Sequence, residues 1–209
     1  MSSRDFRIGV LGSGTGSNCE AILKACATGR IPGRVALVLS DVADAFILER
    51  ARKHRIEARF IGPSQSKTKL EPELEERAAK LLRDAGADLV ALAGYMRVVK
   101  PPILRTFAGR IMNVHPSLLP AFPGLRAWEQ ALKHGVKVTG CTVHFVDEGV
   151  DSGPIILQQP VPVLPNDTPT SLHQRIQVAE YNVYPEAIRL FAEGKLKIDG
   201  RVVKVLEYD

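Results

Sequence analysis

The sequence predicts an α/β protein with a mostly parallel sheet, helices on both faces and an antiparallel edge in its C-terminal half. Short apolar runs alternate with segments of helical periodicity in the first half, which is the pattern of β-α-β units with right-handed crossovers. Later, two β-rich runs follow one another across a short loop, and this spacing predicts an antiparallel pair. A length of 209 residues suits a single domain.

In the first half, the apolar runs predict strands and the periodic segments predict helices. The strands are expected at residues 7–11, 35–39, 58–61 and 88–93. The helices are expected from about Asn18 to a stop at Gly29, over residues 45–54 and over residues 71–85. This alternation is typical of a Rossmann-like sheet.

The second half begins with the stretch Arg110–Gly124, whose first residues predict a strand over 111–115. Pro116 ends that strand because proline cannot donate to a ladder. A helix is expected over residues 125–134, closed by Gly135. The two β-rich runs then cover residues 137–146 and 154–163, and we expect them at the edge of the sheet.

The C-terminal segment predicts a long helix and a hairpin. Thr168 is a plausible N-cap, with Pro169 in the first helical turn. Pro185 lies inside the helical pattern and is expected to kink or split it, and Gly194 ends it. Residues 196–198 and 202–206 form the expected hairpin, which turns at the dipeptide Asp199-Gly200.

Composition narrows the class of protein. An apolar fraction of 45% with 24% charged residues is typical of a soluble globular protein. The net charge of +5 comes from basic residues spread along the chain, with few aromatics among them, so we expect no nucleic-acid partner. The sequence has neither a signal peptide nor an apolar run of membrane-spanning length, which favours the cytoplasm and no membrane partner. The odd number of cysteines, three, lacks metal-ligand spacing, so reduced thiols and no metal are expected.

A glycine-rich loop joins the first strand to the first helix. Gly12, Gly14 and Gly16 are followed by Ser17 and Asn18, which is a context for binding phosphate at a helix N-terminus. The spacing differs from both the Walker loop and the dinucleotide fingerprint. The loop therefore predicts a site for one phosphate group, with a simple tight turn as the alternative.

Asn113 and His115 project from the same face at the end of a strand, where ligands bind in open α/β sheets. Asp151 lies in the glycine-containing loop between the two late strands. A carboxylate beside an imidazole favours its charged form, and an imidazolium with an amide can polarise a carbonyl and hold an oxyanion. This chemistry suits acyl or formyl transfer to an amine. The alternative for Asp151 is a turn cap.

Several motifs cover nearly the whole chain, and with them the sequence resembles the folate-dependent phosphoribosylglycinamide formyltransferases. The motifs, in family order, are Gly14-Thr-Gly-Ser-Asn18, Leu92-Ala-Gly-Tyr-Met-Arg97, Asn113-Val-His-Pro-Ser-Leu-Leu-Pro120, and Thr142-Val-His-Phe-Val146 continuing to Asp151-Ser-Gly-Pro-Ile-Ile156. The resemblance implies one formyltransferase domain over residues 1–209. It also implies transfer of the formyl group of 10-formyltetrahydrofolate to the amine of 5-phosphoribosylglycinamide in de novo purine biosynthesis, without a covalent enzyme intermediate.

The resemblance also implies roles for individual residues. The catalytic residues of the family fall on Asn113, His115 and Asp151. The substrate phosphate falls on Gly16, Ser17 and Asn18, and a substrate-contacting glutamate on Glu180. The folate-binding residues are Met96, Arg97, Val98, Val99 and Asn113, with the loop 147–150 over the pterin and a basic residue, Lys67 or Lys69, helping to hold folate. The two small-molecule substrates are the expected partners, and the protein is expected to be a monomer or a homodimer.

Trp128, Arg126 and His144 have interpretations that do not involve catalysis. Many family members carry a histidine where this chain has Trp128, which we interpret as a core or cleft-wall aromatic. Arg126 is interpreted as a solvated arginine, with a contact to phosphate or to the folate glutamate as the alternative. His144 is interpreted as a structural histidine rather than a zinc ligand, because it and Cys141 point to opposite faces of a strand.

Other functions remain as alternatives. Water in place of the amine would make the protein a 10-formyltetrahydrofolate hydrolase, and initiator tRNA as acceptor would make it a methionyl-tRNA formyltransferase. Members of those classes carry additional domains. A non-catalytic nucleotide-binding regulator, with the glycine loop as its ligand sensor, is the alternative from a different class.

Overall fold

The computed structural model describes residues 5–66 and 68–206. The chain forms two compact units, Met1–Met112 and Asn113–Asp209. No helix within the described residues has both the length and the apolar character needed to cross a membrane.

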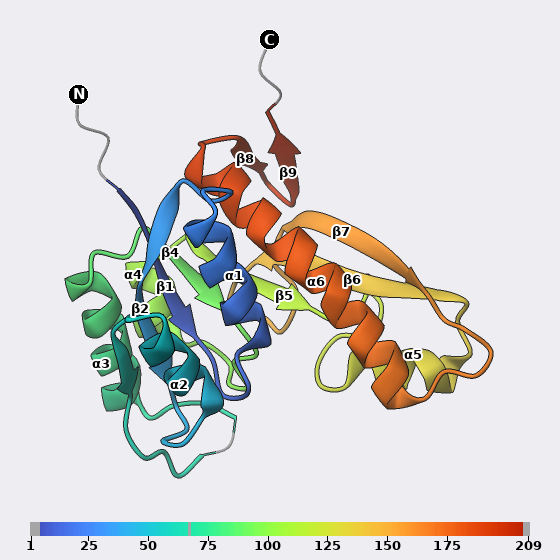
Figure 1. Ribbon diagram of the computed structural model, residues 1–209, viewed down its shortest axis with the longest axis horizontal. Coiled ribbons are helices and arrows are strands. Elements are labelled where there is room, and N and C mark those ends of the chain that lie inside the picture. The colour runs from blue at the N-terminus through green and yellow to red at the C-terminus, as the bar shows by residue number, and fades with distance from the viewer. Residues whose placement is uncertain (1–4, 67, 207–209) are drawn as a thin grey trace. The chain divides into compact units, whose positions relative to one another are not determined.

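The first unit alternates strands and helices as the sequence predicts (Figure 1). All seven predicted elements are present, and the chain adds one short helix, α4, whose two leading prolines and six residues leave little periodicity to detect. The elements are β1 (Phe6–Leu11), α1 (Ser17–Ala27), β2 (Gly33–Ser40), α2 (Phe46–Lys53), β3 (Ala58–Phe60), α3 (Pro72–Asp84), β4 (Leu89–Leu92) and α4 (Pro101–Thr106), followed by β5 (Ile111–His115) across the boundary between the units.

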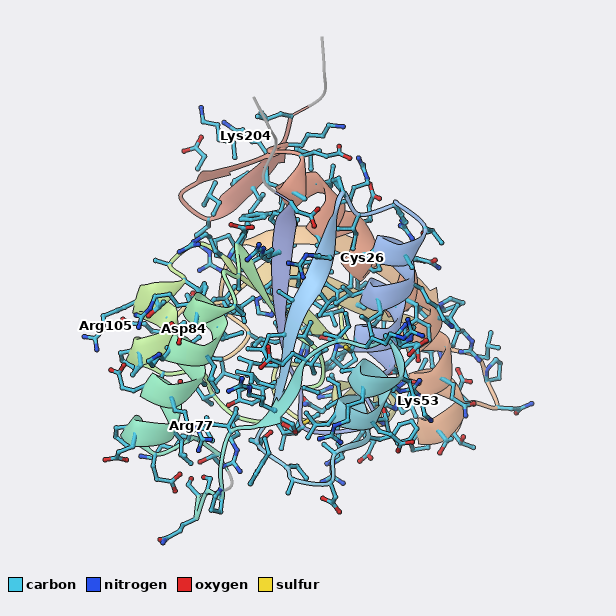
Figure 2. All side chains as sticks on the ribbon, turned by 60° about the vertical axis from the view of Figure 1, so that its left-hand side comes forward. Cys26, Lys53, Arg77, Asp84, Arg105 and Lys204 are labelled. Atoms are coloured by element: carbon cyan, nitrogen blue, oxygen red, sulfur yellow. The ribbon has the colours of Figure 1, made fainter. Side chains whose placement is uncertain are left out.

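The strands of the first unit pair in the order β3-β2-β1-β4, and each of these pairs is parallel. Val10 lies opposite Val38 on one side and Ala91 on the other. Figure 2 shows α3, with Arg77 and Asp84, on one face of the strands and α2, with Lys53, on the other. The prediction of helices on both faces is confirmed. Because helices cover both faces of these strands, the strand sequences are continuous apolar runs.

The second unit carries the predicted antiparallel pair. Its remaining elements are α5 (Ala127–His134), β6 (Val138–Phe145), β7 (Ile155–Pro162), α6 (Pro169–Ala192), β8 (Leu196–Asp199) and β9 (Val202–Val205). Strands β6 and β7 are antiparallel, with Thr142 opposite Gln158. However, β7 also pairs with β9, which pairs in turn with β8, so the expectation that β6 and β7 form the edge was wrong in this respect. The C-terminal hairpin takes the edge because it is long enough to add two strands.

Helix α6 begins as predicted but is not split. Thr168 and Ser171 form a reciprocal capping box, with hydrogen bonds of 3.1 and 2.9 Å. The helix continues through Pro185 to Ala192. Proline removes one backbone donor, and the fully buried Tyr184 and Ile188 on either side keep the helix packed in the core of this unit.

The C-terminal hairpin turns one residue later than predicted. Asp199 pairs with Val202, so the two turn residues are Gly200 and Arg201. Gly200 has φ +60°, the left-handed conformation that glycine adopts without strain. Asp199 remains in β8, where its carboxylate accepts from Lys204 at 2.8 Å.

The first unit contains a buried acid, Glu75, on α3. Its side chain is fully buried, and Oε1 accepts the backbone N–H of Lys100 at 3.2 Å. Oε2 has no hydrogen-bond partner among the described residues. Burial is the largest influence, and it raises the pKa of Glu75 to about 7.

We expect the variant Glu75→Gln to be more stable than the wild type at high pH. A carboxyl whose pKa is raised in the folded state binds its proton more tightly there than in the unfolded chain. Its destabilising effect therefore grows as pH rises from about 4.3 to 7. Glutamine has no charge to bury, so the free energy of unfolding at pH 8 should rise by roughly 1–3 kcal/mol and should differ little near pH 4.5. Urea denaturation at both pH values measures this, with the exposed Glu73→Gln as the control. A variant that is less stable than the wild type at pH 8 would contradict it.

Candidate active site

The loop after β5 holds the candidate catalytic residues in place through buried hydrogen bonds of the second unit. Thr142 on β6 donates to the carbonyl of Ser117 at 2.7 Å and accepts from the N–H of Leu119 at 3.0 Å. Gln158 on β7 donates to the carbonyl of Leu119 and to the Thr142 hydroxyl, both at 2.9 Å. The loop is therefore fixed to two strands, which leaves little freedom at the end of β5.

His115 and Asp151 form the predicted pair. His115 is 4% exposed, and its Nδ1 lies 3.2 Å from Oδ2 of Asp151. Its Nε2 lies 2.8 Å from the carbonyl oxygen of Phe122. Both ring nitrogens therefore face oxygen acceptors, an arrangement that only the imidazolium, with two N–H donors, satisfies.

Asp151 collects contacts from several segments of the second unit. Its Oδ2 also accepts the backbone N–H of Gly124 at 2.8 Å. Its Oδ1 lies 3.7 Å from Nε2 of His144, which is too long for a hydrogen bond. The backbone of Asp151 has φ +52°, a conformation that is costly for most residues and tolerated best by Asp and Asn after Gly.

His144, which the sequence indicates to be a structural histidine, lies in the same cluster. Nε2 of His144 lies 3.3 Å from Nδ2 of Asn113, and Nδ1 lies 2.8 Å from the carbonyl oxygen of Phe145. Because a carbonyl only accepts, Nδ1 carries the proton of a neutral ring. Nε2 then offers a lone pair to the Asn113 amide. His144 lies two residues after Thr142 on β6, the strand that precedes the loop of Asp151. This spacing is the sequence signal that could have placed His144 near Asp151.

His144 is kept neutral by its surroundings. The side chain is 3% exposed, and this burial is the main reason why its pKa is lowered from the ordinary value of 6.5. The charge of Asp151 acts in the opposite direction but does not outweigh burial. Neutral His144 orients the amide of Asn113 so that the second N–H of this amide is available to another acceptor.

The glycine loop lies in the first unit. Gly16 has φ +74° and serves as the N-cap of α1, and a Cβ at this position would lie 2.6 Å from Ile47. Only glycine fits there. Ser17 and Asn18 occupy the first turn of α1, at the positive end of the helix dipole. The loop can therefore present N–H groups to an anion.

The expected folate-binding segment also lies in the first unit. Met96 is 60% exposed, which is high for a large apolar side chain, whereas Val99 is buried. The N–H of Val98 donates to the carbonyl of Thr68 at 2.9 Å. The guanidinium of Arg97 is buried and bonded to protein groups, which leaves its backbone as the part able to meet a ligand. Lys69 is exposed, and Lys67 lies outside the described residues.

Trp128, Arg126 and Glu180 lie in the second unit. Trp128 stacks on His173, with ring centroids 3.7 Å apart, and so joins α5 to α6. Arg126 is 71% exposed and pairs with Glu129, as expected for a solvated arginine. Glu180 is buried on α6. No group of three or more His, Cys, Asp or Glu side chains suited to a metal occurs in the described part of the chain.

Comparison with known proteins gives consistent results. A model of the formyl transferase family matches residues 6–188. A phosphoribosylglycinamide formyltransferase of Escherichia coli is 43% identical, over 92% of this chain and 90% of its own. The crystal structure of glycinamide ribonucleotide transformylase 1 from Symbiobacterium toebii is 56% identical with a TM-score of 0.94, over 99% of this chain and 96% of that one. The crystal structure of a formyltetrahydrofolate deformylase from Pseudomonas syringae is 26% identical with a TM-score of 0.90, over 99% of this chain and 67% of that one. The α/β fold class predicted from the sequence is confirmed.

We expect His144 to be a neutral Nδ1–H tautomer at pH 6.5, where a histidine of the unfolded chain is half protonated. Long-range ¹H–¹⁵N correlation spectra distinguish the two ring nitrogens and follow their titration. The variant His144→Gln identifies the signal, and the protein unfolded in urea gives the reference titration. A proton on Nε2, or a midpoint at or above 6.5, would contradict the assignment.

Proposed function

We propose, since the chain belongs to the formyl transferase family, that it transfers the formyl group of 10-formyltetrahydrofolate to the amine of 5-phosphoribosylglycinamide. The products are formylglycinamide ribonucleotide and tetrahydrofolate, and the reaction belongs to de novo purine biosynthesis. The match over residues 6–188 extends through both compact units, which supports one formyltransferase domain over residues 1–209. The cytoplasm, where purine precursors are made, is the proposed location.

The observation that carries this proposal is the cluster of Asn113, His115, His144 and Asp151 in one buried corner of the second unit. The amine nitrogen attacks the formyl carbon, and the carbonyl oxygen becomes an oxyanion. The free N–H of the Asn113 amide, oriented by His144, donates to that oxygen. The bond from carbon to N10 of the folate then breaks, and the proton lost by the amine passes to N10.

His115 supplies positive charge to this step. With Asp151 at Nδ1, the ring is held in place for its charged form. Its Nε2–H donates to Phe122 in the present arrangement, so a direct bond to the formyl oxygen requires that contact to open. Catalytic hydrogen bonds commonly reach their final geometry only in the substrate complex. Asp151 is the group placed to relay the proton from the amine.

The binding roles are proposed for the segments that present suitable groups. The N–H groups at Gly16, Ser17 and Asn18 hold the phosphate of phosphoribosylglycinamide, and Glu180 contacts the same substrate. The exposed side chain of Met96 contacts folate, together with the backbone of Arg97 and Val98. The remaining proposed folate contacts are Val99, Asn113 and Lys69. Val99 would contact folate through its backbone, because its side chain is buried.

Hydrolysis of 10-formyltetrahydrofolate is the alternative favoured by a specific observation, the likeness to the Pseudomonas syringae deformylase. The same cluster would hold the oxyanion when water attacks instead of the amine. The higher identity to the Escherichia coli and Symbiobacterium toebii proteins supports the amine as acceptor.

We expect His115→Ala to lower kcat for formyl transfer by about two to three orders of magnitude. The loss of one oxyanion-stabilising group raises a barrier by roughly 2.7–4 kcal/mol. Steady-state assays with phosphoribosylglycinamide and 10-formyltetrahydrofolate measure the effect. His54→Ala, which removes a histidine that pairs with Glu20 in the first unit, is the control and should retain wild-type kcat.

The assay is run with three acceptors to separate the candidate functions. Transfer to phosphoribosylglycinamide, with little formate released in its absence, supports the proposal. Formate release that does not depend on the amine would establish hydrolysis, and transfer to initiator tRNA would establish the third enzyme class. Wild-type turnover in His115→Ala would remove the catalytic assignment while leaving the acceptor result in place.

A further inference from the structure

The first unit contains a buried carboxylate that the proposed reaction does not use. Asp41 follows β2, and its side chain is 3% exposed. One oxygen, Oδ1, accepts the hydroxyl of Ser13 at 2.6 Å, and the other, Oδ2, accepts Nε of Arg97 at 2.5 Å. Asp41 thus stands between the glycine loop and the segment that follows β4.

Ser13 makes this connection tighter. Its hydroxyl donates to Asp41 and also accepts the backbone N–H of Met96 at 2.9 Å. Its own N–H donates to the carbonyl of Gly94 at 3.1 Å. A single side chain on the phosphate-binding loop is therefore bonded both to Asp41 and to the backbone of the folate-binding segment.

Arg97 extends the network to a fourth segment. Its Nη1 donates to the hydroxyl of Ser64 at 3.0 Å and to the carbonyl oxygens of Ser66 and Lys69. The side chain is 9% exposed, so its charge is matched by Asp41 and these oxygens rather than by water. Four segments that follow parallel strands β1 to β4 are therefore joined through Ser13, Asp41 and Arg97.

We propose that Ser13, Asp41 and Arg97 are positioning residues that couple the binding of the two substrates. The inference rests on the proposed function, which places phosphate on the glycine loop and folate on the segment after β4. A substrate that orders one of these segments also orders the other through the shared bonds. The second substrate then loses less conformational entropy on binding. By linkage, each substrate tightens the binding of the other by the same factor.

Ser13→Ala is the decisive variant. It removes the hydroxyl that joins the glycine loop to Asp41 and to Met96, and it leaves the ion pair between Asp41 and Arg97 intact. Asp41→Asn is the second variant. An amide has one oxygen, so it cannot accept from both the Ser13 hydroxyl and the Arg97 guanidinium as the two carboxylate oxygens do. Ser13→Thr keeps the hydroxyl and tests rescue.

Arg50→Gln is the matched control. Arg50 also bonds to the glycine loop, because its Nε donates to the carbonyl of Thr15 at 2.8 Å. Its ion-pair partner, however, is Glu20 rather than Asp41. Its loss can change the affinity for the phosphate-bearing substrate. The network joining the loop to Met96 and Arg97 remains, so the coupling should remain as well.

The readout is the Kd of phosphoribosylglycinamide, measured by titration calorimetry with and without saturating tetrahydrofolate, which forms a ternary complex that cannot turn over. In the wild type and in Arg50→Gln, tetrahydrofolate should lower this Kd by about five-fold or more. The ratio should fall to about one in Ser13→Ala and Asp41→Asn, and Ser13→Thr should restore it.

A merely structural role would lower the melting temperature of the variants without changing the ratio of the two Kd values. That result, or a ratio of one in the wild type, would overturn the proposal. The wild-type transfer assay separates this failure from failure of the proposed function. An enzyme that formylates phosphoribosylglycinamide but shows no coupling loses only this inference.

Discussion

The Asp151 carboxylate, whose side chain is 12% exposed, is the constraint on which the candidate active site depends. A charge removed from water must be matched, and here it is matched by the N–H of Gly124 and by Nδ1 of His115. These contacts bring together the end of β5, the loop after it and the loop between β6 and β7. His144 then fits beside the carboxylate as a neutral ring, because a second buried cation would cost more than it gains. The neutral state of His144 thus follows mainly from its burial, against the opposing charge of Asp151.

The first unit uses the same device in a different place. Asp41 is buried just after β2, and like Asp151 it gathers donors from separate segments. In both units the parallel or mixed strands supply rigid ends, and a single aspartate fixes the loops that leave them. The difference is the partner. Arg97 gives Asp41 a permanent cation, whereas Asp151 faces the imidazole of His115.

Much of this organisation could be predicted from local sequence. Apolar runs located the strands, and Thr168 with Pro169 located the start of α6, because such patterns act within a few residues. The pairing of His115 with Asp151 was also within reach, since strand ends and loops meet at one edge of a sheet. The hydrogen-bond networks around His144 and around Asp41 could not be predicted from local sequence. The place of His144 depends on which way Asn113 presents its amide, and the contact of Asp41 with Arg97 joins residues 56 positions apart.

Other errors had simple local causes. Pro185 was expected to kink or split α6, and the helix is not split because the packing of a long apolar face outweighs one missing hydrogen bond. The hairpin turn was placed at Asp199-Gly200 because that dipeptide favours turns, whereas the pairing of Asp199 with Val202 set the register. Both cases show tertiary contacts overriding a short-range preference.

The left-handed backbone of Asp151 limits what can replace this residue. Glycine would relieve the strain, which costs roughly 1–2 kcal/mol in most residues, yet it would remove the carboxylate that gathers the cluster. Glutamate would keep the charge but gain both strain and length. Aspartate is therefore the side chain that fits both the left-handed backbone and the contacts with Gly124 and His115 at this position.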